Sequence, residues 1–277
     1  MVSMPQLTID SDLSIYYRDE NPTGFPTIVL LHGLGVSSDS WIYQIPAFTL
    51  AGFRVIVPDV RGFGKSGYHD GQVSITMLSQ DVRQMIHALE ISPVYLTGIS
   101  MGGTIALQTL LDEPGAVSRA ILISTFARLR PEGARTWLYL LSRFVILSLL
   151  GLPAQAHWVA HSLFPAEDQE YLRVAFYDQL LQANPKAYRK TIQALARFDV
   201  RNRLSEIQTP TLIISGENDS TVPISTQVKL ARGIKSSRQI IIPAAGHGVT
   251  VERPDQVNTS ILEFLCAGND WEFPYDH

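Results

Sequence analysis

The sequence predicts an α/β protein in which a mostly parallel, doubly wound sheet has helices on both faces and is interrupted by an inserted helical segment. Short runs that are apolar on both faces alternate with stretches of helical periodicity, which is the pattern of a parallel sheet. This rhythm stops after residue 124 and resumes near residue 211. The 277 residues, 45% of them hydrophobic, can form one sizeable core. We therefore expect a core made of residues 1–125 and 206–277, and a helical insertion at residues 126–205.

The first part of the chain predicts a hairpin, two buried strands and two helices. Apolar and polar residues alternate as in a β-hairpin at Leu7, Ile9, Leu13, Ile15 and Tyr17. Residues 27–31 and 53–58 are apolar on both faces, as central parallel strands are. Between them, residues 40–51 can form a helix that Pro46 bends or begins. Residues 74–90 predict an amphipathic helix through one apolar stripe: Ile75, Leu78, Val82, Met85, Ile86 and Leu89.

The second part of the chain supplies the remaining strands and the insertion. Further buried strands are predicted at residues 94–97, 119–124, 211–215 and 239–242, and a last helix at residues 254–265. Residues 126–205 contain no convincing strand and divide into four helical pieces at Gly151-Leu152-Pro153, Phe164-Pro165 and Asn184-Pro185. We expect these pieces to lie over the carboxyl edge of the sheet. Residues 268–277 contain no predictable element.

One stretch of the insertion, residues 137–150, is apolar apart from Ser142, Arg143 and Ser148. It is too short and too interrupted for a membrane span, which needs about 20 apolar residues. We expect a helix buried against the main domain. The alternatives are a wall that binds an acyl chain and a helix that lies on a membrane surface.

Charge and composition exclude several classes of partner. The net charge is -4, the isoelectric point is near 6.0 and no basic tract occurs, so nucleic acid and anionic membranes have no support as partners. The single cysteine, Cys266, cannot form an internal disulfide. Residues 1–9 lack the basic and apolar regions of a signal peptide. We therefore expect a cytoplasmic protein without stable membrane insertion.

The most informative motif follows the strand at residues 94–97. Gly98-Ile99-Ser100-Met101-Gly102 matches G-x-S-x-G in a strand-turn-helix context. A serine at the tip of such a turn has strained backbone geometry, and larger side chains two residues away would collide. Glycines at positions 98 and 102 leave that space. The turn therefore exposes the Ser100 hydroxyl at the start of a helix.

Two further residues stand just past later strands, so three side chains are expected to meet at one edge of the sheet. Asp219 follows the strand at 211–215, and His247 follows the strand at 239–242. Ligands of open α/β sheets bind beyond the carboxyl ends of the strands. A serine hydroxyl needs an imidazole to take its proton, and the imidazole needs a carboxylate to fix its tautomer. Ser100, Asp219 and His247 could supply these three groups.

Five motifs at predicted strand ends occur in a characteristic order: H-G-L-G, D-V-R-G-F-G-K-S, G-I-S-M-G-G, G-E-N-D-S-T-V-P, and G-H followed by E-R-P-D-Q-V-N. From Thr27 to Leu265 the chain resembles an α/β-hydrolase with a helical cap. The resemblance implies the α/β-hydrolase fold, with Ser100 as nucleophile, Asp219 as acid and His247 as base. It also implies that the backbone N–H groups of Leu34 and Met101 form the oxyanion hole.

Neighbouring residues compete for these roles. Glu217 is close to Asp219, but the spacing G-x-x-D-x-x-x-P to Pro223 favours Asp219. No carboxylate directly follows the strand that ends at Ser124, and Asp199 is interpreted as a turn or capping residue.

Other polar residues of the motifs are interpreted as structural. His32 precedes the predicted oxyanion amide, and Asp59 with Arg61 resembles a pair that fixes a turn. His157 and His161 are one helical turn apart, a spacing that could bind a metal. Without a third ligand nearby, we expect them to lie on the surface or to line a pocket.

A serine nucleophile predicts acyl transfer followed by hydrolysis. It argues against the haloalkane dehalogenases and epoxide hydrolases that the chain resembles overall, because these have aspartate at the position of Ser100. The chain is interpreted as a carboxylic ester hydrolase, a serine hydrolase for a small or medium, fairly apolar ester. No metal and no organic cofactor is expected, the expected partner is the small-molecule ester, and the protein is expected to be a monomer or homodimer.

Two alternatives remain open. The first is a C–C bond hydrolase or enol-lactonase of aromatic degradation, because arginines of the insertion could bind a substrate carboxylate: Arg128, Arg130, Arg135 and Arg143. Against it, the oxyanion stretch H-G-L-G-V-S-S lacks the glycine-proline run associated with C–C hydrolases. The second is a ligand-binding protein or receptor that keeps the hydrolase fold without turnover.

Overall fold

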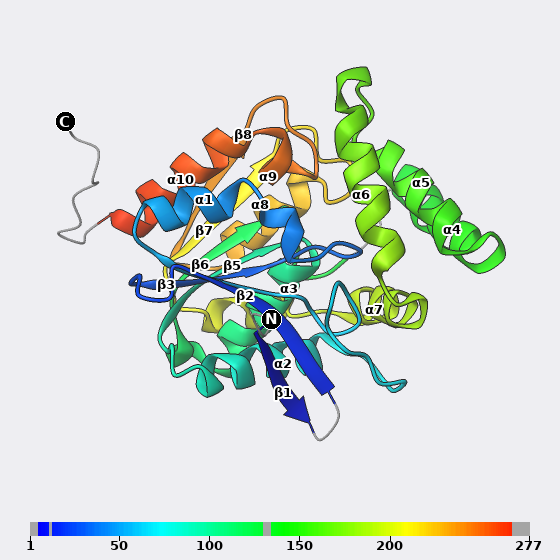
Figure 1. The fold of residues 1–277 in the computed structure, drawn as a ribbon. Coiled ribbons are helices and arrows are strands. Elements are labelled where there is room, and N and C mark those ends of the chain that lie inside the picture. Colours follow the sequence, from blue (N-terminus) through cyan, green and yellow to red (C-terminus); the bar gives the residue numbers. More distant parts are fainter. Residues whose placement is uncertain (1–4, 11–12, 130–133, 268–277) are drawn as a thin grey trace.

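The computed structural model describes residues 5–10, 13–129 and 134–267, and it contains an eight-stranded sheet with the order β1-β2-β4-β3-β5-β6-β7-β8 (Figure 1). The first two strands form the predicted hairpin and join the sheet antiparallel through β4. All other neighbouring strands run parallel. The strands are β1 (Gln6–Asp10), β2 (Leu13–Glu20), β3 (Thr27–Leu31), β4 (Arg54–Pro58), β5 (Val94–Ile99), β6 (Val117–Ile123), β7 (Thr211–Gly216) and β8 (Ser237–Ile242). The predicted α/β fold with a mostly parallel sheet is confirmed.

The sheet has a hydrophobic core on each face. Val29 and Leu31 of β3 pack with residues of α2 (Ile75–Ala88), α3 (Met101–Asp112) and α8 (Ile224–Gly233). Ile28 and Leu30 of the same strand belong to the core on the other face, with residues of α1 (Gln44–Leu50) and α10 (Pro254–Cys266). Figure 1 shows these two helices side by side on one side of the sheet. Complete burial of such side chains contributes about 1.5–3 kcal/mol each. This explains why the central strands are mainly apolar on both faces.

Among the described residues, four α-helices lie between β6 and β7, and Figure 1 shows them gathered at one end of the molecule. They are α4 (Ala134–Leu149), α5 (Gly151–Leu163), α6 (Glu170–Gln182) and α7 (Pro185–Arg197). Asn184 begins α7 by accepting hydrogen bonds from the backbone N–H groups of Lys186 and Ala187. Arg128 and Asp199 form an isolated β-bridge, so the chain enters and leaves this helical segment at neighbouring points.

The helix predicted over residues 40–51 is shorter than expected. A 3₁₀ turn covers Ser38–Trp41, and α1 begins only at Gln44. Pro46 lies in the first turn of α1, where a missing backbone N–H breaks no hydrogen bond of the helix. Pro46 therefore stands at the start of the helix, which is one of the two roles expected for it.

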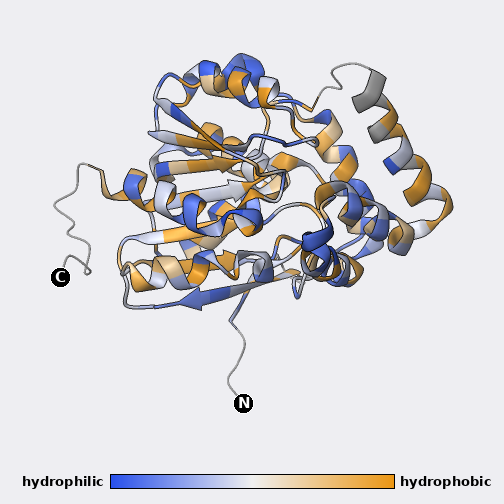
Figure 2. Ribbon diagram, turned by 90° about the horizontal axis from the view of Figure 1, so that it is seen from above, coloured by the Kyte–Doolittle hydropathy of each residue, from blue (hydrophilic) through white to orange (hydrophobic). Residues whose placement is uncertain are grey.

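The expectation that α4 is buried against the main domain is wrong for most of its described side chains. Leu138 is 65% exposed, Leu141 50%, Val145 41% and Leu149 77%. These four residues share one face of the helix, while α4 packs mainly on α5. Figure 2 shows α4 as a largely hydrophobic helix at the outer end of the molecule. Among the helices of the described residues, none has the length and apolar character needed to cross a membrane.

Candidate active site

Ser100 lies at a strained turn between β5 and α3, with φ 52° and ψ -111°. A Cβ atom at residue 98 would overlap the backbone of Gly102, and one at residue 102 would overlap the carbonyl of Leu31. The expected steric reason for both glycines is therefore confirmed. Gly103, which the sequence interpretation passed over, is equally constrained, because a Cβ there would collide with Thr125.

Two hydrogen bonds to the neighbouring strand region hold this turn in place. The backbone N–H of Ser100 donates to the carbonyl of Ile123 at 2.9 Å. The carbonyl of Ser100 accepts from Thr125 Oγ1 at 2.7 Å. Because both ends of the residue are fixed, the backbone strain is maintained by the surrounding structure. Met101 is the first residue of α3, so its N–H is one of the helix groups without an intrahelical acceptor.

His247 and Asp219 form a hydrogen-bonded pair at the ends of β8 and β7. His247 Nδ1 lies 2.9 Å from Asp219 Oδ2 and 3.1 Å from Oδ1. An ionised carboxylate only accepts hydrogen bonds, so Nδ1 has the proton and donates it. The Nε2 atom of the neutral ring is then free of a proton and can act as a base. The Asp219 side chain is completely buried, while 11% of the His247 side chain remains exposed.

Ser100 and His247 line one cavity of about 420 Å³, a volume typical of small-molecule sites. Gly33 and Leu34 also line this cavity, whose walls are mainly apolar. The inserted segment supplies much of the wall, from Phe126, Leu129, Val159, Leu163, Phe164, Leu172, Phe176 and Leu195. The cavity therefore lies between the carboxyl ends of the strands and the inserted helices.

His32 fixes the backbone beside Ser100. The ring is fully buried, and burial lowers its pKa, so the imidazole is neutral. Its Nε2 accepts the backbone N–H of Val60 at 2.9 Å, which leaves Nδ1 to donate to the Gly33 carbonyl at 2.8 Å. In a trans peptide the N–H of Leu34 points away from that carbonyl. A Cβ at Gly33 would lie 3.9 Å from Ser100 Cβ, so this peptide is close to the serine.

The other two candidate acids, Glu217 and Asp199, form their contacts away from His247. Glu217 Oε2 accepts a hydrogen bond from the backbone N–H of Ala244 at 2.9 Å. Asp199 pairs with Arg201 and Arg128 at the exit of the helical segment, which agrees with a turn role. Asp219 is the carboxylate in contact with His247.

Asp59 and Arg61, which were both expected to be structural, have different partners in the structure. Asp59 Oδ1 accepts from the backbone N–H of Ser38 at 2.7 Å, and Oδ2 accepts from that of Lys65 at 2.7 Å. Arg61 pairs instead with Asp81 of α2. Asp59 therefore fixes two loops through their backbone, and the partner of Arg61 lies 20 residues further along the chain.

The rings of the two histidines of α5 (Gly151–Leu163) contact each other, with centroids 4.5 Å apart and planes inclined by 58°. In the part of the chain that the structure describes, no group of three or more His, Cys, Asp or Glu side chains could hold a metal ion. The spacing of His157 and His161 therefore identifies a ring contact on one helix.

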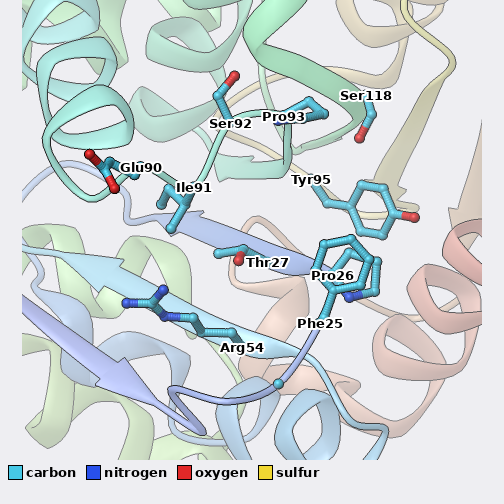
Figure 3. Close-up of a pocket in the computed structure, with 11 residues that line it drawn as sticks. Phe25, Pro26, Thr27, Arg54, Glu90, Ile91, Ser92, Pro93, Tyr95 and Ser118 are labelled. Atoms are coloured by element: carbon cyan, nitrogen blue, oxygen red, sulfur yellow. The ribbon is translucent and has the colours of Figure 1, made fainter.

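A second hollow, of about 580 Å³, opens at the opposite edge of the sheet (Figure 3). Its lining includes Thr27, Arg54 and Tyr95 at the amino ends of β3, β4 and β5. The guanidinium of Arg54 forms a bidentate pair with Asp19, at 2.9 and 2.7 Å. Because ligands of parallel sheets bind at the carboxyl ends of the strands, the cavity beside Ser100 is the candidate active site.

Glu252 is a residue of the site region that the sequence interpretation missed. Both of its carboxylate oxygens accept from the backbone N–H of Gly246, at 3.1 and 3.0 Å. Oε2 also accepts from Gln169 Nε2 at 3.2 Å. Glu252 thus connects the loop before His247 with the inserted segment. Glu252 belongs to the E-R-P run after His247 in the sequence, but its hydrogen-bond partners become apparent only in the folded chain.

The sheet order, the serine on its strained turn and the His–Asp pair at neighbouring strand ends together define an α/β-hydrolase. The chain belongs to the alpha/beta hydrolase fold family, whose profile matches residues 26–254. That match covers most of the core and the whole helical segment.

Individual relatives have several activities. The protein named Putative carbamate hydrolase RutD of Agrobacterium fabrum is 32% identical over 258 residues, covering 88% of this chain and 94% of its own. The enol-lactonase of Burkholderia xenovorans LB400 superposes with a TM-score of 0.85 at 26% identity, covering 94% of this chain and 99% of its own. An esterase of Exiguobacterium antarcticum superposes with a TM-score of 0.84 at 26% identity, covering 91% and 96%. The family is one of hydrolases, and the bond cleaved differs among its members.

Proposed function

We propose that this protein is a serine hydrolase that cleaves a small or medium, fairly apolar carboxylic ester. The observation that supports this function is that Ser100 and His247 line the same apolar cavity, and that His247 is hydrogen-bonded to the buried Asp219. Acyl transfer to a serine needs a nucleophile and a base in a substrate pocket, and an apolar pocket suits an apolar ester. The esterase among the structural relatives agrees with this proposal.

In the proposed mechanism, His247 Nε2 takes the proton of Ser100 while Oγ attacks the ester carbonyl. The N–H groups of Leu34 and Met101 stabilise the negative oxygen of the tetrahedral intermediate. His247 then gives the proton to the leaving alcohol, and the acyl group remains on Ser100. A water molecule activated by His247 releases the acid. Asp219 keeps the proton on Nδ1 and stabilises the charged ring in each step.

The helices between β6 and β7 act in this proposal as a cap that shapes the acyl site. Their apolar side chains form much of the cavity wall. Because the wall is apolar, burial of the acyl chain provides binding energy of about 0.8 kcal/mol for each methylene. We therefore expect selectivity for chain length rather than for charge.

A ladder of p-nitrophenyl esters, from acetate to palmitate, tests the proposal. We expect turnover to peak at a short or medium chain length and to fall toward palmitate, because the cavity of about 420 Å³ encloses only a limited chain. A p-nitrophenyl carbamate in the same assay tests the chemistry of the carbamate-hydrolase relative. If no ester is cleaved although a fluorophosphonate labels Ser100, the substrate is of another kind. Absence of labelling would favour a binding protein without turnover.

Arg143 gives a specific reason to keep the enol-lactonase alternative. Its side chain lines the cavity, and its Nη2 donates to the hydroxyl of Tyr188 at 2.9 Å. A guanidinium at the wall of a mainly apolar cavity can bind a substrate carboxylate through charge-assisted hydrogen bonds. The enol-lactonase among the structural relatives agrees with this alternative.

The variant Arg143→Met separates the two candidates. If the substrate contains a carboxylate, we expect kcat/KM for a carboxylate-bearing p-nitrophenyl ester to fall about tenfold or more, while a neutral ester of equal length changes little. If the natural substrate is a neutral ester, both esters should respond alike. The thermal unfolding midpoint is the control, because Arg143 also holds Tyr188. Arg143→Lys, which keeps the charge, should retain part of the preference for the charged ester.

A further inference from the structure

The buried carboxylate of Asp219 has donors besides His247. Oδ1 accepts the backbone N–H groups of Thr221 at 2.9 Å and Val222 at 2.8 Å. Oδ2 accepts from Nε2 of Gln227, a residue of α8, at 3.3 Å. Gln227 is completely buried. Each carboxylate oxygen is therefore held by a donor that does not belong to the histidine.

The amide of Gln227 is itself held in one orientation. Its Nε2 also donates to the carbonyl of Val222 at 2.8 Å, and a carbonyl can only accept. Its Oε1 accepts from Ser215 Oγ at 2.7 Å. Ser215 Oγ accepts in turn from Gln239 Nε2 at 3.0 Å, so the serine proton is available to Gln227. These bonds leave Nε2 as the end of the amide that faces Asp219.

This arrangement fixes the plane of the Asp219 carboxylate. Rotation of the carboxylate about the Cβ–Cγ bond would move both oxygens, so it would break the bonds from the two backbone N–H groups to Oδ1 and the bond from Gln227 to Oδ2. Gln227 holds the second oxygen, Oδ2, which is the closer of the two to His247 Nδ1. A hydrogen bond to a charged group is stronger than one between neutral groups. The contact can therefore affect how well Asp219 orients the imidazole.

We propose that Gln227 is a positioning residue of the active site, which acts through Asp219 and is anchored by Ser215 and Gln239. The proposal rests on the proposed function, because it assumes that Asp219 orients the base of the reaction. Gln227 is not itself one of the residues that line the cavity beside Ser100. Its loss should therefore slow the chemical step without weakening substrate binding.

The variant Gln227→Met tests this role, since methionine has a similar length but cannot donate. We expect kcat for the best p-nitrophenyl ester to fall about ten- to hundredfold, with KM changed less than about twofold. The rate of fluorophosphonate labelling of Ser100 should fall by a similar factor. Ser215→Ala, which removes the hydroxyl that donates to the Gln227 amide and accepts from Gln239, should lower kcat about threefold.

Gln44→Met is the matched control. Gln44 is also completely buried, and its amide donates to the Thr250 carbonyl at 3.0 Å and to Asn258 Oδ1 at 3.1 Å. It should lower the unfolding midpoint about as much as Gln227→Met while kcat stays within about threefold of the wild type. A folded Gln227→Met protein with wild-type kcat overturns the proposal, as does an equal loss of kcat in the Gln44→Met control.

Two further variants, Ser215→Ala and Ser100→Ala, complete the test. If Gln227→Met does not fold, Ser215→Ala tests the proposal in its place. An unchanged kcat in that variant then overturns the positioning role of Gln227. The proposed function fails separately, if Ser100→Ala protein retains ester turnover, and that result does not depend on Gln227.

Discussion

Replacement of Ser100 by alanine is expected to abolish ester turnover and to leave the fold intact. The variant removes the oxygen that attacks the ester, and no other hydroxyl occupies its place at the tip of the turn. Loss of the nucleophile in a protease with the same triad lowers kcat by about 10⁶-fold. The backbone of the turn should persist, because it is held by Ile123 and Thr125 through main-chain groups of residue 100. Steady-state hydrolysis of the best p-nitrophenyl ester measures the effect.

Ser124 offers a matched control for this experiment. It follows β6, beside the strand that leads to Ser100, and it also has a positive φ, of 46°. Its side chain is completely buried. Ser124→Ala should therefore retain turnover and fluorophosphonate labelling, although its stability can change. Activity above a trace in Ser100→Ala, after contaminating esterases are excluded, would show that the nucleophile is another residue.

The turn at Ser100 could be predicted because its causes are local. The glycines at positions 98 and 102 and the strand before them stand within a few residues, and the steric reason for them applies to any chain. The strands could be predicted for a similar reason, since burial on both faces leaves a continuous apolar run in the sequence. The convergence of Ser100, Asp219 and His247 followed from one rule about the carboxyl ends of parallel strands.

The contacts that support the site could not be predicted, because they depend on how distant segments pack. Gln227 reaches Asp219 from α8, and Glu252 reaches Gly246 from the end of the short helix α9 (Val249–Glu252), without any periodic signal in the sequence. The sequence indicated a structural role for Asp59 and Arg61, but it did not indicate their partners, which lie in other segments. Asp59 proved to be occupied by backbone donors.

The packing of the inserted helices could not be predicted either, for the same reason. An apolar run predicts that a helix packs against another element, but it does not indicate which face of the helix is buried. In α4, Leu147 is 4% exposed while Leu149 is 77% exposed, although both belong to the same apolar run. The shape of the cavity depends on this packing, which explains why the substrate could be described only by its class.

Replacement of Asp219 by asparagine is expected to lower kcat by about 10⁴-fold, as the same change does in a serine protease. Here the structure supplies the reason. The backbone N–H groups of Thr221 and Val222 require an acceptor at the position of Oδ1. The introduced amide must then place its NH₂ group at the position of Oδ2, 2.9 Å from His247 Nδ1. This NH₂ group donates to Nδ1 and moves the ring proton to Nε2, where the ring can no longer accept the proton of Ser100.

Glu217→Gln is the control that separates the two acidic residues of this loop. Glu217 accepts a hydrogen bond from the Ala244 backbone, and a glutamine oxygen can accept the same bond. We expect kcat within about threefold of the wild type, because a neutral acceptor replaces a charged one at an exposed site. A mild effect of Asp219→Asn together with a severe effect of Glu217→Gln would assign the acid to Glu217. The His247–Asp219 pair would then be a structural contact, and the base would need another explanation.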